Sequence, residues 1–244
     1  MNNTIKELIE RQSIRIFTDK PINEEDKELI INSAINAPSA GNMQMYSIID
    51  VVDQDVKDKL AVLCDNQSFI AKAKMIFIFC ADYQKWFNAF EDLNLNPRHP
   101  DSGDLLLSIE DTMIAAQNAV TAAWSLGIGS CYIGDIMENY EQVTELLNLP
   151  QFVYPACMVV FGYPDKEHKA PTKPKRVDNK YVVFKDKYRC LNADELKDMF
   201  IERTKPKAYE EWMKAFIERK YNSDFSKEMS RSANKYIERY KQEK

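Results

Sequence analysis

Two arginines flank a serine near the start of the chain, in the segment RQSIRIF at residues 11–17. The guanidinium groups of Arg11 and Arg15 and the hydroxyl of Ser13 are groups that bind a phosphate or the polar edge of a heterocycle. Taken alone, an Arg-x-Ser-x-Arg run is more often a charged surface turn than a binding site. The hypothesis of a site therefore needs further polar residues elsewhere in the chain.

Such residues occur at predicted turns beside apolar segments. Amides, hydroxyls and cations are found there at Ser39, Asn42, Gln44, Gln67, Lys173, Lys175 and Arg176. The chain has six glycines, and three of them lie in GIGSCYIGD at residues 127–135, which indicates a close approach of the backbone at that place. A phosphorylated heterocyclic cofactor would use cations for its phosphate, hydroxyls for a polyol, and amides and backbone for its ring.

The sequence offers few residues for other kinds of catalytic site. The two histidines, His99 and His168, lie in charged, loop-like surroundings, so we expect neither a histidine-based nucleophile system nor a metal site. The glycines of residues 127–135 do not form G-x-G-x-x-G and follow a predicted helix, which disfavours a dinucleotide-binding fold of that type. We therefore assign no catalytic side chain and no metal ligand, because a cofactor would carry out the reaction.

Composition limits the partners and the compartment. The net charge of −5 at pH 7 argues against nucleic-acid binding, which needs a basic surface. The five cysteines show no C-x-x-C spacing, which favours free thiols in a reducing compartment. No apolar run approaches the roughly 18 residues of a membrane span, so we expect a cytoplasmic protein without membrane partners.

The hydrophobic pattern predicts the elements that position these groups. Apolar runs at residues 46–52, 75–81 and 153–163 are typical of buried strands, and Lys180–Phe184 is predicted as a further short strand. Helical spacing starts at Thr4, Asn23, Val56, Tyr140 and Ala193. Continuous apolar strands that alternate with helices indicate an α/β or α+β sheet covered on both faces.

The segment at residues 105–126 gives the strongest helix signal. It is apolar nearly all round, with charges at Glu110 and Asp111 alone, so it is expected to be buried on every side. It would therefore be the spine of the core, a subunit interface, or both. Aromatic stripes between Tyr209 and Tyr240 also need a covering surface, either the domain's own core or a second subunit.

The ordered set RQSIRIF, APSAGNMQ, the loop at Gln67, AAWSLGIGSCYIGDI and KPK resembles the flavin-binding pattern of the nitroreductase family. Within that family it is most similar to the branch of NADPH-dependent nitroreductases and flavin reductases. The resemblance implies an α+β fold with a central mixed, mostly antiparallel sheet flanked by helices. It also implies an FMN-binding domain over residues 1–192 and a helical C-terminal extension over residues 193–244, packed on the same domain or on a dimer partner.

The resemblance further implies which residues bind FMN. The phosphate and ribityl chain would be bound by Arg11, Gln12 and Ser13, with Lys173 and Lys175 closing on the phosphate. Arg15 would reach the pyrimidine edge at N1 and O2, where a cation stabilises the negative charge of reduced flavin. The rest of the ring edge would contact the side chain of Gln67 and the backbone of Ile133, Gly134 and Asp135.

Other cofactor contacts would come from a second subunit, because members of the family are dimers with FMN at the interface. The residues implied are Ser39, Ala40, Gly41 and Asn42. The helix at residues 105–126 would then be the dimer spine. In this branch, C-terminal arginines hold the NADPH 2′-phosphate, and the corresponding cations here would be Arg203, Lys205 and Lys207.

Three positions depart from the family pattern. Gln12 replaces a residue that is often basic or histidine, Asp135 stands where a second glycine is usual, and Lys175 stands where arginine is usual. Lys175 keeps the positive charge but lacks the bidentate fork of arginine. Asp135 is expected to alter the flavin potential or the choice of electron acceptor.

The function implied is that of an FMN-dependent oxidoreductase that works by ping-pong. NADPH, favoured over NADH, would give hydride to flavin N5 and leave, and a nitroaromatic, a quinone or free flavin would then take the electrons. Alternatives on the same fold are a reductive dehalogenase and a flavin-consuming enzyme. A different class is a non-catalytic flavin-binding protein whose C-terminal helices bind a partner.

Overall fold

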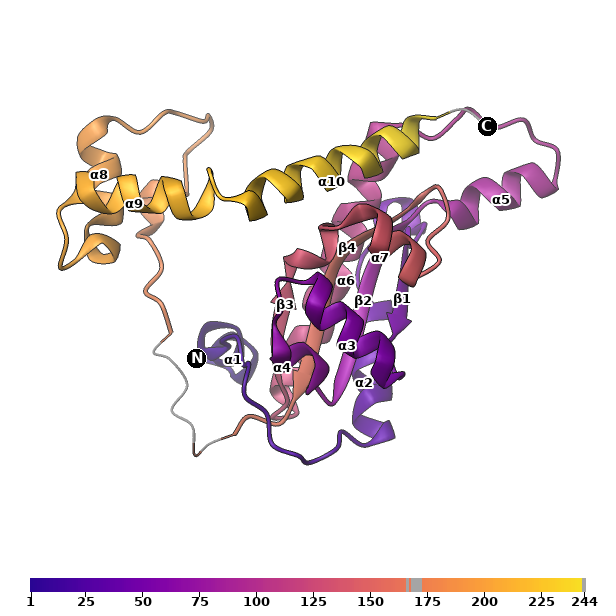
Figure 1. Ribbon diagram of the computed structural model, residues 1–244, viewed down its shortest axis with the longest axis horizontal. Coiled ribbons are helices and arrows are strands. Elements are labelled where there is room, and N and C mark those ends of the chain that lie inside the picture. The colour runs from indigo at the N-terminus through magenta and orange to yellow at the C-terminus, as the bar shows by residue number, and fades with distance from the viewer. Residues whose placement is uncertain (166, 168–172, 243–244) are drawn as a thin grey trace. The chain divides into compact units, whose positions relative to one another are not determined.

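The computed structural model describes residues 1–165, 167 and 173–242 (Figure 1). Its sheet has four strands in the order β1-β2-β4-β3, namely Tyr46–Asp50, Met75–Asp82, Val153–Gly162 and Gly129–Ile133. All three neighbouring pairs are antiparallel. Within the described residues, a parallel pairing occurs at an isolated bridge between Ser13 and Ser130. The expected mostly antiparallel sheet is confirmed, and its four strands pair in antiparallel fashion throughout.

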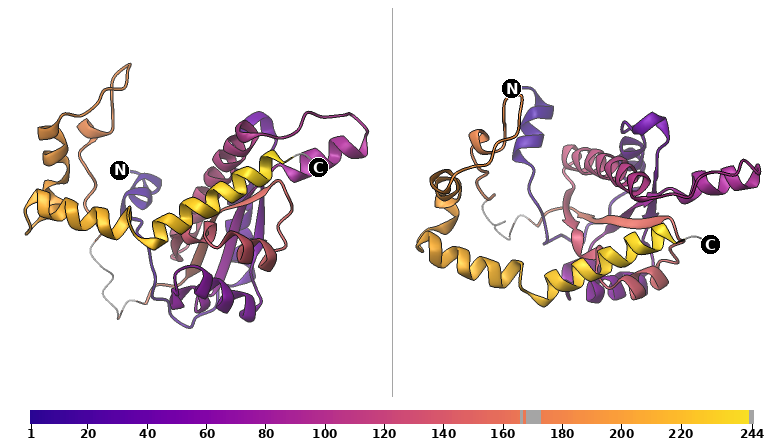
Figure 2. Two further views of the ribbon diagram at one scale, coloured as in Figure 1. Left: turned by 45° about the horizontal axis from the view of Figure 1, so that its top comes forward. Right: turned by 90° about the horizontal axis from the view of Figure 1, so that it is seen from above.

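Helices cover both faces of the sheet (Figure 2). One face packs against α2 (Glu24–Ile35) and α6 (Ser102–Ser125). The other face packs against α3 (Gln54–Leu63), α4 (Ser68–Ala71), α7 (Tyr140–Leu146) and the C-terminal part of α10 (Asp224–Lys241). Strands β2 and β4 are buried along their whole length, as their continuous apolar sequences predict.

The remaining elements are short. They are the helices α1 (Asn3–Glu10), α5 (Gln84–Asp92), α8 (Ala193–Thr204) and α9 (Tyr209–Lys220), and the 3₁₀ turns η1 (Ala40–Asn42), η2 (Gly134–Met137) and η3 (Asn179–Tyr181). The strand predicted at Lys180–Phe184 is wrong. The side chain of Asp178 accepts a hydrogen bond from the backbone N–H of Lys180, and this cap starts the turn η3 instead.

The chain divides into two compact units, one of Met1–Ala170 with Glu228–Lys244 and one of Pro171–Lys227. This division differs from the boundary expected at residue 193. From Glu228 onward the last helix belongs with the sheet, and its Tyr236 and Tyr240 are each 2% exposed within the core of that unit. The second unit contains η3, α8 and α9, and the rings of Phe200 and Phe216 both stack on Trp212.

In the single chain, one face of helix α6 is buried, whereas burial on every side was expected. The alanines on its inner face pack against the sheet. Its outer face carries exposed apolar side chains at Leu106, Leu107, Met113 and Ile114. Leu106 is the most exposed of them, at 60%. The outer face therefore leaves apolar area for a further partner. Among the described helices, none is both long and apolar enough to cross a membrane.

Candidate cofactor site

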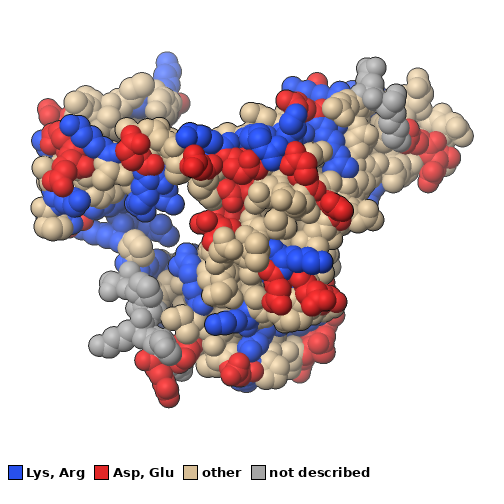
Figure 3. Space-filling view, in the orientation of Figure 1, with Lys and Arg blue, Asp and Glu red and all other residues tan. Residues whose placement is uncertain are grey.

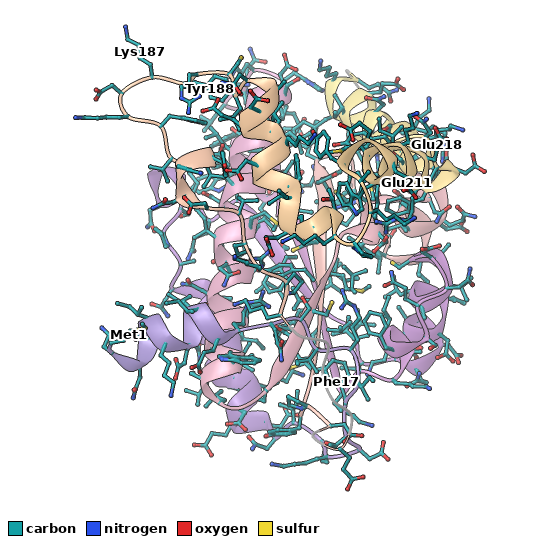
Figure 4. All side chains as sticks on the ribbon, turned by 90° about the vertical axis from the view of Figure 1, so that its left-hand side faces the viewer. Met1, Phe17, Lys187, Tyr188, Glu211 and Glu218 are labelled. Atoms are coloured by element: carbon teal, nitrogen blue, oxygen red, sulfur yellow. The ribbon has the colours of Figure 1, made fainter. Side chains whose placement is uncertain are left out.

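The segment at residues 11–17 lies against the edge strand β3. The backbone N–H of Ile14 donates to the carbonyl of Ser130 at 2.9 Å. Gly129 makes this approach feasible, because a Cβ there would lie 2.6 Å from Cγ1 of Ile14. Phe17, which is labelled in Figure 4, packs in the same way on Gly162, where an added Cβ would lie 2.7 Å from the Phe17 ring. Two of the scarce glycines thus serve the packing of RQSIRIF on the sheet.

The polar residues of this segment surround Cys131 on β3. Burial raises the pKa of the Cys131 thiol, while the charge of Arg15, a hydrogen bond with Ser13 and the charge of Arg11 oppose that rise. Gln12 is half-buried in the same segment. The Arg15 guanidinium also lies 6.0 Å from the centre of the Phe69 ring on α4. Arg11 and Arg15 therefore both lie near Cys131 on β3, and Arg15 also lies near α4.

Arg11 carries an unsatisfied donor. Its Nη1 atom is buried and has no hydrogen-bond partner within the described residues. A buried guanidinium nitrogen without an acceptor is unfavourable, and most buried donors in proteins have a partner. An anionic ligand such as a phosphate would satisfy this atom.

Gln67 lies beside the turn that follows β3. Helix α3 is followed by two residues with positive φ, Asp65 at 62° and Asn66 at 53°, and these redirect the chain to Gln67. The Gln67 Nε2 atom donates to the Cys64 carbonyl at 2.8 Å and to Asp135 Oδ2 at 3.1 Å. Next to Asp135, Gly134 has open space where a Cβ would be. The structure thus brings Gln67 together with residues 133–135.

The segment Ser39–Asn42 lies at the other edge of the sheet. It precedes β1, and β2 and β4 separate β1 from β3. Three strand spacings place these edges roughly 14 Å apart. In one chain, the residues expected from a second subunit are therefore separate from the Arg11, Arg15 and Gln67 group.

A buried carboxylate on α6 holds this segment. Asp111, 2% exposed, accepts hydrogen bonds from the backbone N–H groups of Ala40 at 2.8 Å and Met45 at 3.2 Å. Gly41 has φ 55° and Asn42 has φ 56°, so the turn is tight. Sequence reasoning assigned no role to Asp111, although a carboxylate within an apolar helix was the available signal.

Glu138 is a second residue that the sequence reasoning missed. It follows η2 and is 4% exposed. Burial raises its pKa to about 7, and the charges of Asp135, Asp65 and Glu228 act in the same direction. A buried titratable carboxyl therefore lies next to the turn that carries Asp135.

The other expected cations belong to the second unit, over which Lys and Arg side chains are visible in Figure 3. A cavity of about 900 Å³ in this unit is lined in part by Lys175, Arg176 and Arg203. Lys205 instead pairs with Glu202 at 2.8 Å, and Lys207 pairs with Glu211 at 3.4 Å. Lys173 is half-buried near the start of the unit. Of the three cations expected for NADPH, Arg203 alone lines this cavity within the described residues.

Comparisons with known proteins show what this chain is similar to. Residues 8–163 match the Nitroreductase family. The chain is 34% identical over 242 residues to the FMN reductase (NAD(P)H) of Bacillus subtilis, covering 98% of this chain and 92% of that relative. It is 35% identical over 207 residues to the oxygen-insensitive NADPH nitroreductase of Salmonella typhimurium, covering 83% and 85%. The solved NADPH:FMN oxidoreductase of Vibrio harveyi, complexed with NAD+, superposes with a TM-score of 0.81 at 27% identity, covering 97% of this chain and 98% of that one.

Proposed function

The chain belongs to the nitroreductase family, and from this premise we propose that it is an FMN-dependent oxidoreductase that uses NAD(P)H, with NADPH favoured. The electron acceptors proposed are nitroaromatics, quinones or free flavin. The family match confirms the resemblance based on RQSIRIF and the later motifs. The names of the relatives, an FMN reductase and an NADPH nitroreductase, support both the oxidoreductase class and the cofactor.

The observation that carries the proposal is the buried, unsatisfied Nη1 of Arg11 beside Ser13 and Arg15. Its donor chemistry fits a phosphate, so Arg11, Gln12 and Ser13 would bind the phosphate end of FMN. Arg15 would lie at the pyrimidine edge and stabilise negative charge there. Gln67 and the backbone of residues 133–135 would complete the ring edge.

The chain's contribution is binding, orientation and charge. FMN, when bound, supplies the atom that accepts hydride, which no side chain of the protein can do. Arg15 favours the more negative state of the ring, because a nearby cation stabilises developing negative charge. The packing of Ile14 on Gly129 keeps the segment at residues 11–17 in one position and so fixes Arg15.

A second copy of the chain would complete the site. Ser39, Ala40, Gly41 and Asn42 lie at the opposite edge of the sheet from Arg11, so one chain presents two separate halves. The exposed apolar face of α6 offers area for a homodimer interface, and Asp111 on the same helix holds the segment that would enter the partner's site. These features support a homodimer with FMN between the subunits.

The second unit would bind the NADPH phosphate. Arg203 and Lys175 line one cavity there, whereas Lys205 and Lys207 are paired with glutamates. A guanidinium can bind a phosphate bidentately, so Arg203 is the proposed partner of the 2′-phosphate. The buried free thiols of Cys64, Cys80, Cys131 and Cys157 support a reducing, cytoplasmic location.

An anaerobic titration tests the proposed function. Purified protein should be yellow, should lose its flavin absorbance on addition of NADPH, and should recover it on addition of a nitroaromatic, a quinone or free flavin. A yellow protein that neither NADPH nor NADH bleaches would favour a non-catalytic flavin-binding protein. A colourless protein that does not bind added FMN would contradict every flavin-based function.

A further inference from the structure

The side-chain amide of Gln67 has both of its N–H groups occupied within the protein. Nε2 donates to the Cys64 carbonyl at 2.8 Å and to Asp135 Oδ2 at 3.1 Å. The backbone N–H of Gln67 is also used, donating to the Ala61 carbonyl at 2.9 Å. Among the described residues, the Oε1 atom has no recorded hydrogen-bond donor. Oε1 is therefore the polar atom of this side chain that remains for a ligand.

The chemistry of the two partners fixes which amide atom faces them. A carbonyl oxygen and an ionised carboxylate are acceptors only, so both require the NH₂ end of the amide. Turning the amide over would place Oε1 against both oxygens and leave two acceptor pairs in repulsion. The hydrogen-bond partners therefore determine which end of the Gln67 amide is the nitrogen and which is the oxygen.

We propose that Asp135 is a positioning residue that locks the Gln67 amide, so that Oε1 faces the bound flavin and accepts a hydrogen bond from ring N3–H. This inference rests on the proposed function, since it concerns how this chain receives FMN. An amide oxygen needs a donor, and N3–H is the ring N–H of the oxidised flavin. A glutamine held in this way discriminates for that N–H instead of bonding any polar ring edge.

Cys64 alone would not lock the amide. Its carbonyl occupies one of the two N–H groups, which leaves the second free to donate to a flavin carbonyl oxygen. Asp135 removes that option by accepting the second N–H. The carboxylate also polarises the amide and strengthens Oε1 as an acceptor, because linked hydrogen bonds reinforce one another.

Asp135 also brings negative charge close to the flavin. Its carboxylate lies one hydrogen bond behind the amide that faces the ring, and the charges of Asp135 and Asp65 both act on buried Glu138. Negative charge near the ring disfavours the reduced, more negative flavin. The charge of Asp135 should therefore lower the midpoint potential, opposing the effect of Arg15.

Binding of FMN and of 3-methyl-FMN, which lacks the N3–H, tests the proposal. The apoproteins of the wild type and of three variants, Asp135→Ala, Asp135→Asn and Gln67→Met, are titrated with each flavin while the quenching of flavin fluorescence is followed. We expect the wild type to bind 3-methyl-FMN at least about tenfold more weakly than FMN. Gln67→Met corrects for the bulk of the added methyl group. In this variant the ratio of the dissociation constant for 3-methyl-FMN to that for FMN should fall to about threefold or less.

The two Asp135 variants separate orientation from charge. Asparagine can still accept from Gln67 through its oxygen, so Asp135→Asn should keep the wild-type ratio within about twofold. Asp135→Ala frees the amide, and its ratio should fall toward that of Gln67→Met. The midpoint potential of bound flavin, measured by dye equilibration, should be more positive in both variants than in the wild type.

Each outcome bears on one of the two claims. Equal affinity of the wild type for FMN and 3-methyl-FMN would overturn the inference while leaving FMN binding intact. Wild-type discrimination in folded Asp135→Ala would show that Asp135 does not set the amide. If Asp135→Ala fails to fold, the affinity ratio of the wild type and the midpoint potential of Asp135→Asn still test the proposal. An unchanged midpoint potential in Asp135→Asn contradicts the charge effect. Failure of the wild type to bind FMN would instead contradict the proposed function.

Discussion

The carboxylate of Asp111 on α6 accepts a hydrogen bond of 2.8 Å from the backbone N–H of Ala40. Its other oxygen accepts from the backbone N–H of Met45 at 3.2 Å. One buried side chain therefore joins the proposed dimer helix to the segment proposed to reach the partner's flavin. Dimer formation and cofactor binding should depend on it together.

Asp111→Asn tests this connection. Asparagine has one acceptor oxygen and would turn an NH₂ group toward a backbone N–H, so the free energy of unfolding should fall by about 1–3 kcal/mol. FMN should also be lost more readily during purification. Urea denaturation and the FMN content per chain measure both effects. Asp55→Asn, at an exposed aspartate on α3 away from the proposed dimer helix, is the control. Equal behaviour of Asp111→Asn and wild type would argue against the role of Asp111.

The close packing of Ile14 on Gly129 makes a second prediction. A Cβ at residue 129 would lie 2.6 Å from Ile14 Cγ1, so Gly129→Ala should displace the segment at residues 11–17 and lower stability by about 1–3 kcal/mol. At Gly103 in α6 nothing lies within 4 Å of an added Cβ, and Gly103→Ala should be neutral or stabilising by about 0.5–1 kcal/mol. Thermal unfolding compares the two. Similar unfolding temperatures for both variants would mean that the contact between Ile14 and Gly129 leaves room for a Cβ at residue 129.

Glu138 predicts a pH dependence of stability. Its pKa is raised from 4.5 to about 7 in the folded protein, mainly by burial. The folded state therefore binds the proton more tightly than the unfolded state, and the associated stability is fully present below pH 4.5 and lost as the pH rises through about 7. Glu138→Gln should be more stable than wild type at about pH 8. Its free energy of unfolding should also decline less than that of the wild type between about pH 5 and pH 8.

Urea denaturation across that pH range measures the effect. Glu145→Gln, an exposed substitution on the nearby helix α7, is the control and should keep the wild-type dependence. If Glu138→Gln declines with pH as steeply as the wild type, another group must titrate.

Arg203 and Lys207 form a matched pair for testing the choice of nicotinamide nucleotide. Arg203 lines the cavity of the second unit, whereas Lys207 pairs with Glu211. Loss of a bidentate phosphate contact should raise the KM for NADPH in Arg203→Ala by about tenfold or more, with little change for NADH. Lys207→Ala should leave both KM values nearly unchanged. Equal use of NADPH and NADH by the wild type would remove the basis for a 2′-phosphate site.

The sequence was most informative where local pattern and burial agree. Apolar runs predicted the positions of β1, β2 and β4 closely, although β1 is mostly half-buried rather than buried. The apolar segment at residues 105–126 predicted α6. The strand β3 was less visible, because Gly129 and its neighbours indicate a turn when the packing of Ile14 is unknown. The predicted strand at Lys180–Phe184 failed because the local cap at Asp178 prevailed over the β-branched residues that follow.

For the proposed site, the sequence indicates candidate residue types but not the contacts between them. Arg11, Ser13 and Arg15 share a short segment, so their proximity follows from the sequence alone. The bond between Gln67 and Asp135 joins positions on different elements, and no local pattern indicates it. The same is true of Asp111 and Ala40, whose contact depends on how α6 packs beside β1.

Recovery of FMN binding in mixed dimers tests the central claim, a flavin site built by two copies of the chain. Arg15→Ala damages one half of the site, and Gly41→Val, at φ 55°, damages the other. Each variant alone should retain little FMN. Subunits mixed in equal amounts and allowed to exchange should regain about a quarter of the wild-type FMN content, because half of the dimers then carry one intact site. No recovery after demonstrated subunit exchange would contradict a shared site and would place both halves in the same chain.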